Sequence, residues 1–110
     1  MDGWLSQLIA NTLNAPQQPA IALDAAAHEL RVDGQRVALT RLECEVMQYL
    51  MERAGQAVKR GDLLDDVWGP RYEGGSNVID VVILALRRKL GVRAPAIETV
   101  TRYGYRLRLP

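Results

Sequence analysis

Side chains able to carry out covalent or metal-assisted chemistry are few in this chain. Cys44 is the only cysteine and His28 the only histidine among its 110 residues. A thiol nucleophile needs a base at recognisable spacing, and a structural zinc site needs several sulfur or imidazole ligands, so neither site can be built. Cys44 lies among apolar residues at helical spacing and is predicted to be a small core residue.

The acids Asp62, Asp65 and Asp66 are close enough in the sequence to suggest a metal site or an acid–base pair. They stand near the start of a predicted helix, where the helix dipole favours negative side chains, so we expect them to be solvated. The chain has neither a glycine-rich phosphate loop of P-loop type nor a nucleophile elbow. We therefore predict a protein that is not an enzyme and that uses no metal and no cofactor.

The stretch SNVIDVVILALRRKLG, residues 76–91, begins the strongly basic part of the chain. The formal net charge of the whole chain is only +1, but residues 76–110 contain seven cations and two anions. Cations gathered in this way favour a partner that carries phosphate groups. The alternative is a face that is merely solvated.

The first 19 residues differ in character from the rest. The stretch DGWLSQLIANTL, residues 2–13, predicts a short amphipathic helix, and the NAPQQPA that follows is typical of a linker. Residues 20–110 are predicted to form one domain. Because the sequence shows no secretory leader and no apolar run long enough to span a bilayer, we expect a soluble, cytoplasmic protein with no membrane partner.

From residue 20 onward, apolar and polar residues alternate. The segments AIALD, HELRV and QRVAL are predicted strands, and Asp33-Gly34 between the last two suits a two-residue hairpin turn. Three helices are predicted next, over about 41–54, 60–69 and 76–90. Thr40 and Glu43 provide a capping box for the first of them.

The third helix has two different faces and Ser76 as its expected cap. One face is predicted to pack on the core through Ile79, Ile83, Leu86 and Leu90. The other is predicted to point outward with Asn77, Val81, Leu84, Ala85 and Arg88. Two strand-like runs, IETVT and YRLRL, end the chain as a hairpin in which Gly104 permits a tight reversal. This order predicts an α+β fold of winged helix-turn-helix type: an antiparallel β-meander, a three-helix core and a C-terminal hairpin wing.

Four motifs, LTRLECEVMQYL, LLDDVWG, SNVIDVVILALRRKLG and IETVTRYGYRL, resemble in order and spacing the OmpR/PhoB-type effector domain of bacterial response regulators. The resemblance covers about residues 20–109. It implies a DNA-binding transcriptional regulator of a two-component system, with helix 76–90 in the major groove of double-stranded DNA. It further implies that hairpin 97–109 is a wing near the minor groove, and that loop 68–75 is a candidate contact with RNA polymerase.

The candidate DNA contacts follow from this resemblance and from side-chain chemistry. Ser76 and Asn77 stand at a helix N-terminus, where free amides and short polar side chains suit a phosphate oxygen or a base edge. Arginines at the end of the helix and in the wing suit phosphates. The candidate contacts are Ser76, Asn77, Val81, Leu84, Ala85, Arg87, Arg88, Thr99, Thr101, Arg102 and Tyr103.

The chain departs from the family at positions expected to touch DNA. Val82, Leu84 and Ala85 stand where members commonly carry polar or basic residues, while Glu98 and Thr101 stand where arginine is usual. One interpretation is that DNA binding persists through apolar contacts to thymine methyls and through recognition of DNA shape. The alternative is that the apolar outer face has become a surface for protein interaction or dimerisation.

In members of this family a phosphorylatable receiver domain normally precedes the effector domain. Here GWLSQLIANTL with its linker resembles the end of such a domain, and the receiver itself is not in the sequence. An exposed apolar face on this stretch would favour self-association, so a homodimer is a candidate assembly.

Overall fold

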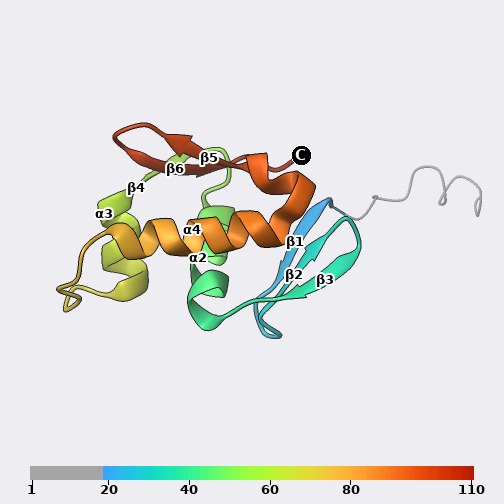
Figure 1. Cartoon of the computed structure of the whole chain (residues 1–110), viewed down its shortest axis with the longest axis horizontal. Helices are drawn as coiled ribbons and strands as arrows, with labels where there is room; N and C mark the ends of the chain where they lie inside the picture. Colours follow the sequence, from blue (N-terminus) through green and yellow to red (C-terminus); the bar gives the residue numbers. More distant parts are fainter. Residues whose placement is uncertain (1–18) are drawn as a thin grey trace, which may run out of the picture.

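The computed structural model describes residues 19–110 (Figure 1). The predicted N-terminal helix and nearly all of its linker lie outside these residues. The elements in chain order are β1 (Ile21–Asp24), β2 (Glu29–Val32), β3 (Gln35–Ala38), α2 (Arg41–Glu52), β4 (Ala57–Lys59), α3 (Arg60–Leu63), the π-helical turn η1 (Leu64–Trp68), α4 (Asn77–Leu90), the 3-10 helix η2 (Gly91–Ala96), β5 (Ile97–Val100) and β6 (Gly104–Leu107). The predicted α+β winged-helix fold is confirmed.

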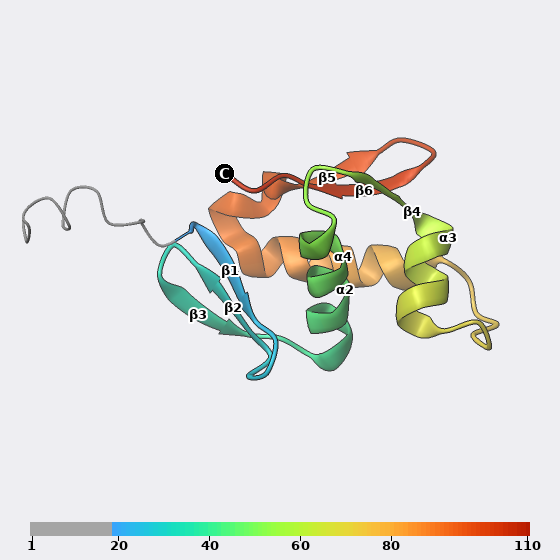
Figure 2. The same cartoon turned by 180° about the vertical axis from the view of Figure 1, so that it is seen from behind.

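The first three strands form an antiparallel sheet in the order β1-β2-β3. Asp33 and Gly34 connect β2 to β3 with φ angles of 48° and 84°, the left-handed pair that a two-residue hairpin turn requires. Ile21, Leu30 and Val32 are buried, so the alternation read from the sequence does select one core face. Figure 2 shows this sheet next to α2 and to the C-terminal end of α4.

Helix α2 begins with the predicted capping box. The Glu43 amide donates to Thr40 Oγ1 at 3.2 Å, and Glu43 Oε1 accepts from the Thr40 amide at 2.9 Å. The same Oε1 accepts from Lys89 Nζ of α4 at 2.5 Å, so one carboxylate caps α2 and holds α4 against it. Burial acts to raise the pKa of Glu43, but the Lys89 ammonium and the Thr40 amide outweigh it and hold that pKa below its ordinary value.

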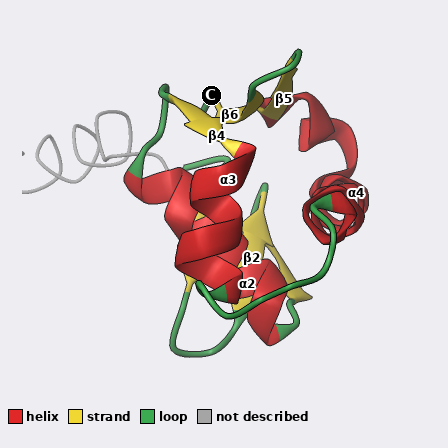
Figure 3. Cartoon of the chain, turned by 90° about the vertical axis from the view of Figure 1, so that its left-hand side faces the viewer, coloured by secondary structure: helices red, strands yellow, loops and turns green. Residues whose placement is uncertain are grey.

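The core lies between the two sheets and the helices. Helix α4 contributes the residues predicted from its spacing, Ile79, Ile83, Leu86 and Leu90, each with at most 1% of its surface exposed. Cys44 is also buried, as predicted, and burial raises the pKa of its thiol. Figure 3 views α4 end on, with α2 and α3 to one side of it and the strands β4, β6 and β5 above the helices. No helix among residues 19–110 is both long and apolar enough to cross a membrane.

The C-terminal hairpin is part of a three-stranded sheet in the order β4-β6-β5. The sequence predicted the C-terminal hairpin but not the pairing of β4 with β6. The hairpin turn is also built differently from the prediction, because the left-handed residue is Arg102, with φ 61°, and not Gly104. A Cβ at Gly104 would overlap the carbonyl oxygen of Val58, so glycine is needed here to let β4 lie close to β6.

Candidate nucleic-acid interface

The outward side of α4 carries a stripe of four exposed residues, Asn77, Val81, Leu84 and Arg88. Their spacing of four, three and four residues places them along one helix face. Val81 is 64% exposed and Leu84 is 51% exposed, so the two aliphatic side chains occupy the middle of the stripe without cover from residues 19–110. We call these four residues the α4 stripe.

Val82 does not belong to this surface. The prediction that it replaces a DNA-contacting residue is wrong, because Val82 is only 9% exposed and packs in the core. It follows Ile79 by three residues and precedes Leu86 by four, which places it on the buried face of α4. Ala85 is half-buried at the edge of the stripe. Of the three apolar departures from the family on this helix, Leu84 is therefore the one whose side chain is exposed.

An ion pair with α3 fixes the start of α4. Arg60 NH1 and NH2 donate to the two carboxylate oxygens of Asp80 at 2.6 Å and 2.9 Å. Arg60 NH2 also donates to the carbonyl oxygen and Oγ of Ser76, at 3.2 Å and 3.3 Å. Ser76 occupies the N-cap position, but the predicted side-chain cap is wrong, because its hydroxyl forms no cap hydrogen bond.

Asp80 is also bound from the wing sheet. The Tyr105 hydroxyl on β6 donates a hydrogen bond to Asp80 Oδ1. The Arg60 guanidinium, assisted by this hydroxyl, lowers the pKa of Asp80 to about 2, although burial opposes the change. Burial and the neighbouring carboxylate raise the pKa of Tyr105. The one acid of α4 is thus neutralised within the protein and presents little negative charge to a polyanion.

Arg87 connects α4 to the wing. Its Nε and NH2 donate to the carbonyl oxygen of Ile97 at 3.1 Å and 2.7 Å, and NH2 donates to Thr99 Oγ1 at 2.9 Å. The guanidinium also lies 5.7 Å from the centroid of the Tyr105 ring. Arg87 and Thr99 were predicted as direct contacts, yet the structure engages both in positioning the wing.

The hairpin tip consists of Thr101, Arg102 and Tyr103, and all three are exposed. Arg102 adopts a left-handed backbone conformation that is unfavourable for a residue with a side chain. Lys59 Nζ of β4 lies 6.0 Å from the centroid of the Tyr103 ring. The tip therefore combines two cations with an aromatic ring.

Most cations of residues 76–110, the basic part of the chain, are already paired with carboxylates. Lys89 pairs with Glu43, Arg93 with Asp33, and both Arg106 and Arg108 with Glu98. The negative charge of Glu98, which stands where the family usually has arginine, is thus offset by two arginines. Within residues 19–110, no carboxylate pairs with Arg88 or Arg102, the cations at the end of the α4 stripe and at the wing tip.

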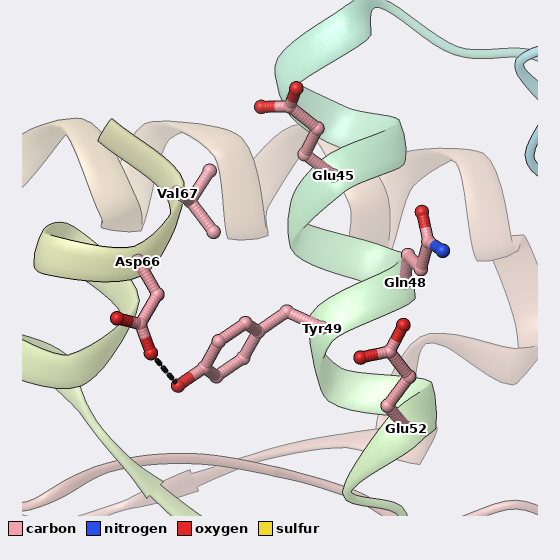
Figure 4. A pocket seen from close by; sticks show the side chains of 6 residues that line it. All are labelled: Glu45, Gln48, Tyr49, Glu52, Asp66 and Val67. Atoms are coloured by element: carbon pink, nitrogen blue, oxygen red, sulfur yellow. Dashed lines mark hydrogen bonds between the residues drawn. The ribbon is translucent and has the colours of Figure 1, made fainter. Parts of the chain in front are cut away.

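A shallow depression of about 280 Å³ lies on a different face, between α2 and η1 (Figure 4). It is lined by Glu45, Gln48, Tyr49, Glu52, Asp66 and Val67. The Tyr49 hydroxyl donates to Asp66 at 2.6 Å, and burial together with this bond raises the pKa of Tyr49 to about 12. The described residues contain no group of His, Cys, Asp or Glu able to hold a metal ion, and the acidic lining is unsuited to phosphate.

Loop 69–76 joins the turn η1 to α4. Gly69 ends η1 with φ 102°, and the rings of Trp68 and Tyr72 approach with centroids 6.5 Å apart. Arg71 and Glu73 in this loop are exposed. The loop lies at the N-terminal end of α4, beyond α3 (Figure 1).

Three residues important for the site were missed from the sequence. Arg60 and Tyr105 hold Asp80, and Lys59 adds a cation beside the wing tip. Lys59 ends the three-residue strand β4 and Arg60 follows it directly, and their residue types give no sign of partners 20 or more residues away. For Tyr105 the sequence did offer one signal. It follows Gly104 in an alternating strand, which places its side chain on the core side.

Sequence comparison finds relatives of this chain among transcriptional regulatory proteins. The chain is 36% identical over 91 residues to the transcriptional regulatory protein TrcR of Mycobacterium tuberculosis, covering 82% of this chain and 35% of that protein. It therefore spans about a third of the length of that relative.

Solved structures show the same fold. The DNA-binding domain of Bacillus subtilis CssR superposes with a TM-score of 0.70 at 30% identity, covering 79% of this chain and 98% of that one. The Klebsiella pneumoniae RstA DNA-binding domain, solved in complex with the RstA box, gives a TM-score of 0.69 at 29% identity, covering 81% and 91%. The profile of the family described as "Transcriptional regulatory protein, C terminal" matches residues 34–107. The chain belongs to this family, the OmpR/PhoB-type effector domains of response regulators.

Proposed function

We propose that this chain is the DNA-binding effector part of a transcriptional regulator and that α4 enters the major groove while the wing approaches the adjacent minor groove. The observation that carries this proposal is the placement of Arg88 and Arg102. Both are exposed, neither is paired with a carboxylate of residues 19–110, and they stand on the two elements that would contact DNA. The relative RstA, solved with its DNA box, supports the same assignment.

The ion pairs around the α4 stripe and the wing favour the binding of phosphate groups. Asp80 is neutralised by Arg60, and Glu98 by Arg106 and Arg108, so the acids near the stripe and the wing repel a polyanion weakly. Among residues 19–110, few cations of α4 and the wing lack a partner within the protein. Affinity should therefore be modest and should fall steeply as salt rises, because each phosphate contact releases counterions.

The test is a titration of the purified 110-residue chain with random and promoter-derived duplexes at two salt concentrations. Binding should weaken with salt, and Arg88→Ala should reduce the affinity and lower the slope of log K against log salt by about one. Arg36→Ala is the matched control, because it removes the same charge from an exposed position on β3. A response that is flat in salt and equal in both variants would contradict the proposal.

A second candidate function rests on the exposure of Val81 and Leu84. Two large aliphatic side chains beside an arginine resemble the centre of a protein interface with a basic rim. In that case Leu84→Glu should abolish a dimer or partner complex measured by light scattering. A homodimer, a contact of loop 68–75 with RNA polymerase and a cytoplasmic location are further proposals that extend the family assignment to this chain.

A further inference from the structure

The middle of the α4 stripe contains no polar atom beyond the backbone. Val81 and Leu84, 64% and 51% exposed, lie between Asn77 at the N-terminal end and Arg88 at the C-terminal end. If α4 lies in the major groove, these two hydrocarbons face base edges. The chemistry of those edges then determines which base pairs they tolerate.

Most base edges in the major groove are poor partners for hydrocarbon. Guanine and adenine present hydrogen-bonding atoms there, and cytosine presents an amino group, whereas thymine adds a C5 methyl group. Covering a polar edge with Val or Leu removes its water without replacing the hydrogen bond, which is unfavourable. Covering the thymine methyl buries apolar surface on both sides.

Two side chains of α4 that could read G·C pairs are occupied within the protein, and the exposed Arg88 lies at the C-terminal end of the stripe, outside its apolar middle. Arg87, which in a free conformation could address guanine, donates instead to the Ile97 carbonyl and to Thr99. Asp80, which could accept from cytosine, is held by Arg60 and Tyr105. Of the two polar residues on the stripe, Asn77 is suited to adenine, and Arg88 is suited to a phosphate or a guanine beyond the apolar middle.

We propose that Val81 and Leu84 read the C5 methyl groups of thymines, so that the preferred DNA site carries thymines opposite the middle of α4. The two residues are separated by about 4.5 Å along the helix axis, which is nearer to one base-pair rise of about 3.4 Å than to two. They therefore face neighbouring base pairs, and the preferred site contains two adjacent A·T pairs with defined strand orientation. This inference rests on the proposed DNA binding.

The experiment selects duplexes from a random library with the 110-residue chain at low salt and then replaces each thymine of the selected site with deoxyuridine. Deoxyuridine lacks only the methyl group. Affinity, measured by fluorescence anisotropy, should fall about fourfold at each of two neighbouring positions, the effect of burying one methyl. Val81→Ala should remove the thymine–deoxyuridine difference at one position and Leu84→Ala at the other.

Val92→Ala is the matched control, because Val92 is an aliphatic residue of η2 that is 87% exposed and lies off the stripe. It should leave both differences unchanged. Equal binding of thymine and deoxyuridine at every position, or a selected site without thymines, would overturn methyl reading while leaving DNA binding intact. Failure to select any duplex at low salt would overturn the proposed function as well.

Discussion

The guanidinium of Arg60 and the carboxylate of Asp80 form a two-point ion pair, with N–O distances of 2.6 Å and 2.9 Å. This pair joins the first residue of α3 to the first turn of α4, and Tyr105 adds a hydrogen bond from β6. One carboxylate therefore connects three elements that surround the candidate DNA surface. Its loss should affect both stability and the orientation of α4.

Acid should weaken the fold through Asp80. Its pKa of about 2 in the folded protein lies below the ordinary value of 3.8, so its contribution is full above about pH 4 and is lost as pH falls toward 2. Because the Asp80 side chain is 47% exposed, solvent screening reduces this contribution to about 1 kcal/mol. Urea unfolding of Asp80→Asn should show that loss at pH 7, and the deficit should shrink below pH 4.

The control for this prediction is Asp65→Asn. Asp65 is an exposed acid of η1 with no hydrogen-bond partner in the described part of the chain, so it changes the charge equally without breaking a contact. A deficit for Asp80→Asn that is the same at every pH would show that the ion pair is not its cause.

Arg102→Gly should separate backbone strain from DNA binding. Arg102 has φ 61°, and glycine adopts this conformation without the Cβ penalty, so the folded protein should gain up to about 1 kcal/mol of stability. The same change removes a wing-tip cation, so duplex affinity should fall and its salt dependence should become shallower. Thermal unfolding and anisotropy measure the two effects, and a variant that loses stability while binding DNA normally would contradict both.

Arg87 and Arg88 are adjacent but should behave in opposite ways. Arg87→Ala removes hydrogen bonds to a strand carbonyl and should cost about 1–3 kcal/mol of unfolding free energy. Arg88→Ala removes an exposed side chain, so stability should change by less than about 0.5 kcal/mol while DNA affinity falls. Each variant is the control for the other. Denaturant unfolding should show the stability loss in Arg87→Ala alone, and duplex titration should show the affinity loss in Arg88→Ala. An equal loss of stability in the two variants would refute this prediction.

Gly104→Ala should disrupt the wing sheet. The added methyl would overlap the Val58 carbonyl oxygen, where neither backbone can move without breaking β4–β6 hydrogen bonds, and we expect a loss of about 1–3 kcal/mol. Gly61→Ala is the opposite case, because Gly61 is exposed within α3 and nothing lies near the added methyl. The Gly61→Ala variant should gain about 0.5–1 kcal/mol of unfolding free energy from the higher helix propensity of alanine. Chemical denaturation would measure both, and similar changes in the two variants would contradict the steric argument.

Features encoded by near neighbours in the sequence were predicted well. The Thr40–Glu43 capping box, the Asp33-Gly34 turn and the buried face of α4 each depend on residues a few positions apart, where type and spacing carry the physics. The family assignment followed from the same local motifs, and the matched profile confirms it.

Features that depend on distant partners were not predictable in this way. The partners of Arg60, Arg87 and Glu43 lie 20, 10 and 46 residues away, and no local pattern encodes them. Val82 was assigned to the outward face of α4 although it is buried. It lies at the border of the two helix faces, where burial depends on which other elements pack against the helix. Strand β4 was too short for its alternation to reveal a neighbour.

The pairing of β4 with β6 ties the hairpin to the segment that precedes α3, while Arg87 ties it to α4. The separation between the α4 stripe and the wing tip is therefore fixed from both sides by bonds internal to the protein. A duplex must match this separation or deform to reach it, and the energy of deformation depends on its sequence. The domain should consequently discriminate among duplexes by groove width, even at base pairs that no side chain touches.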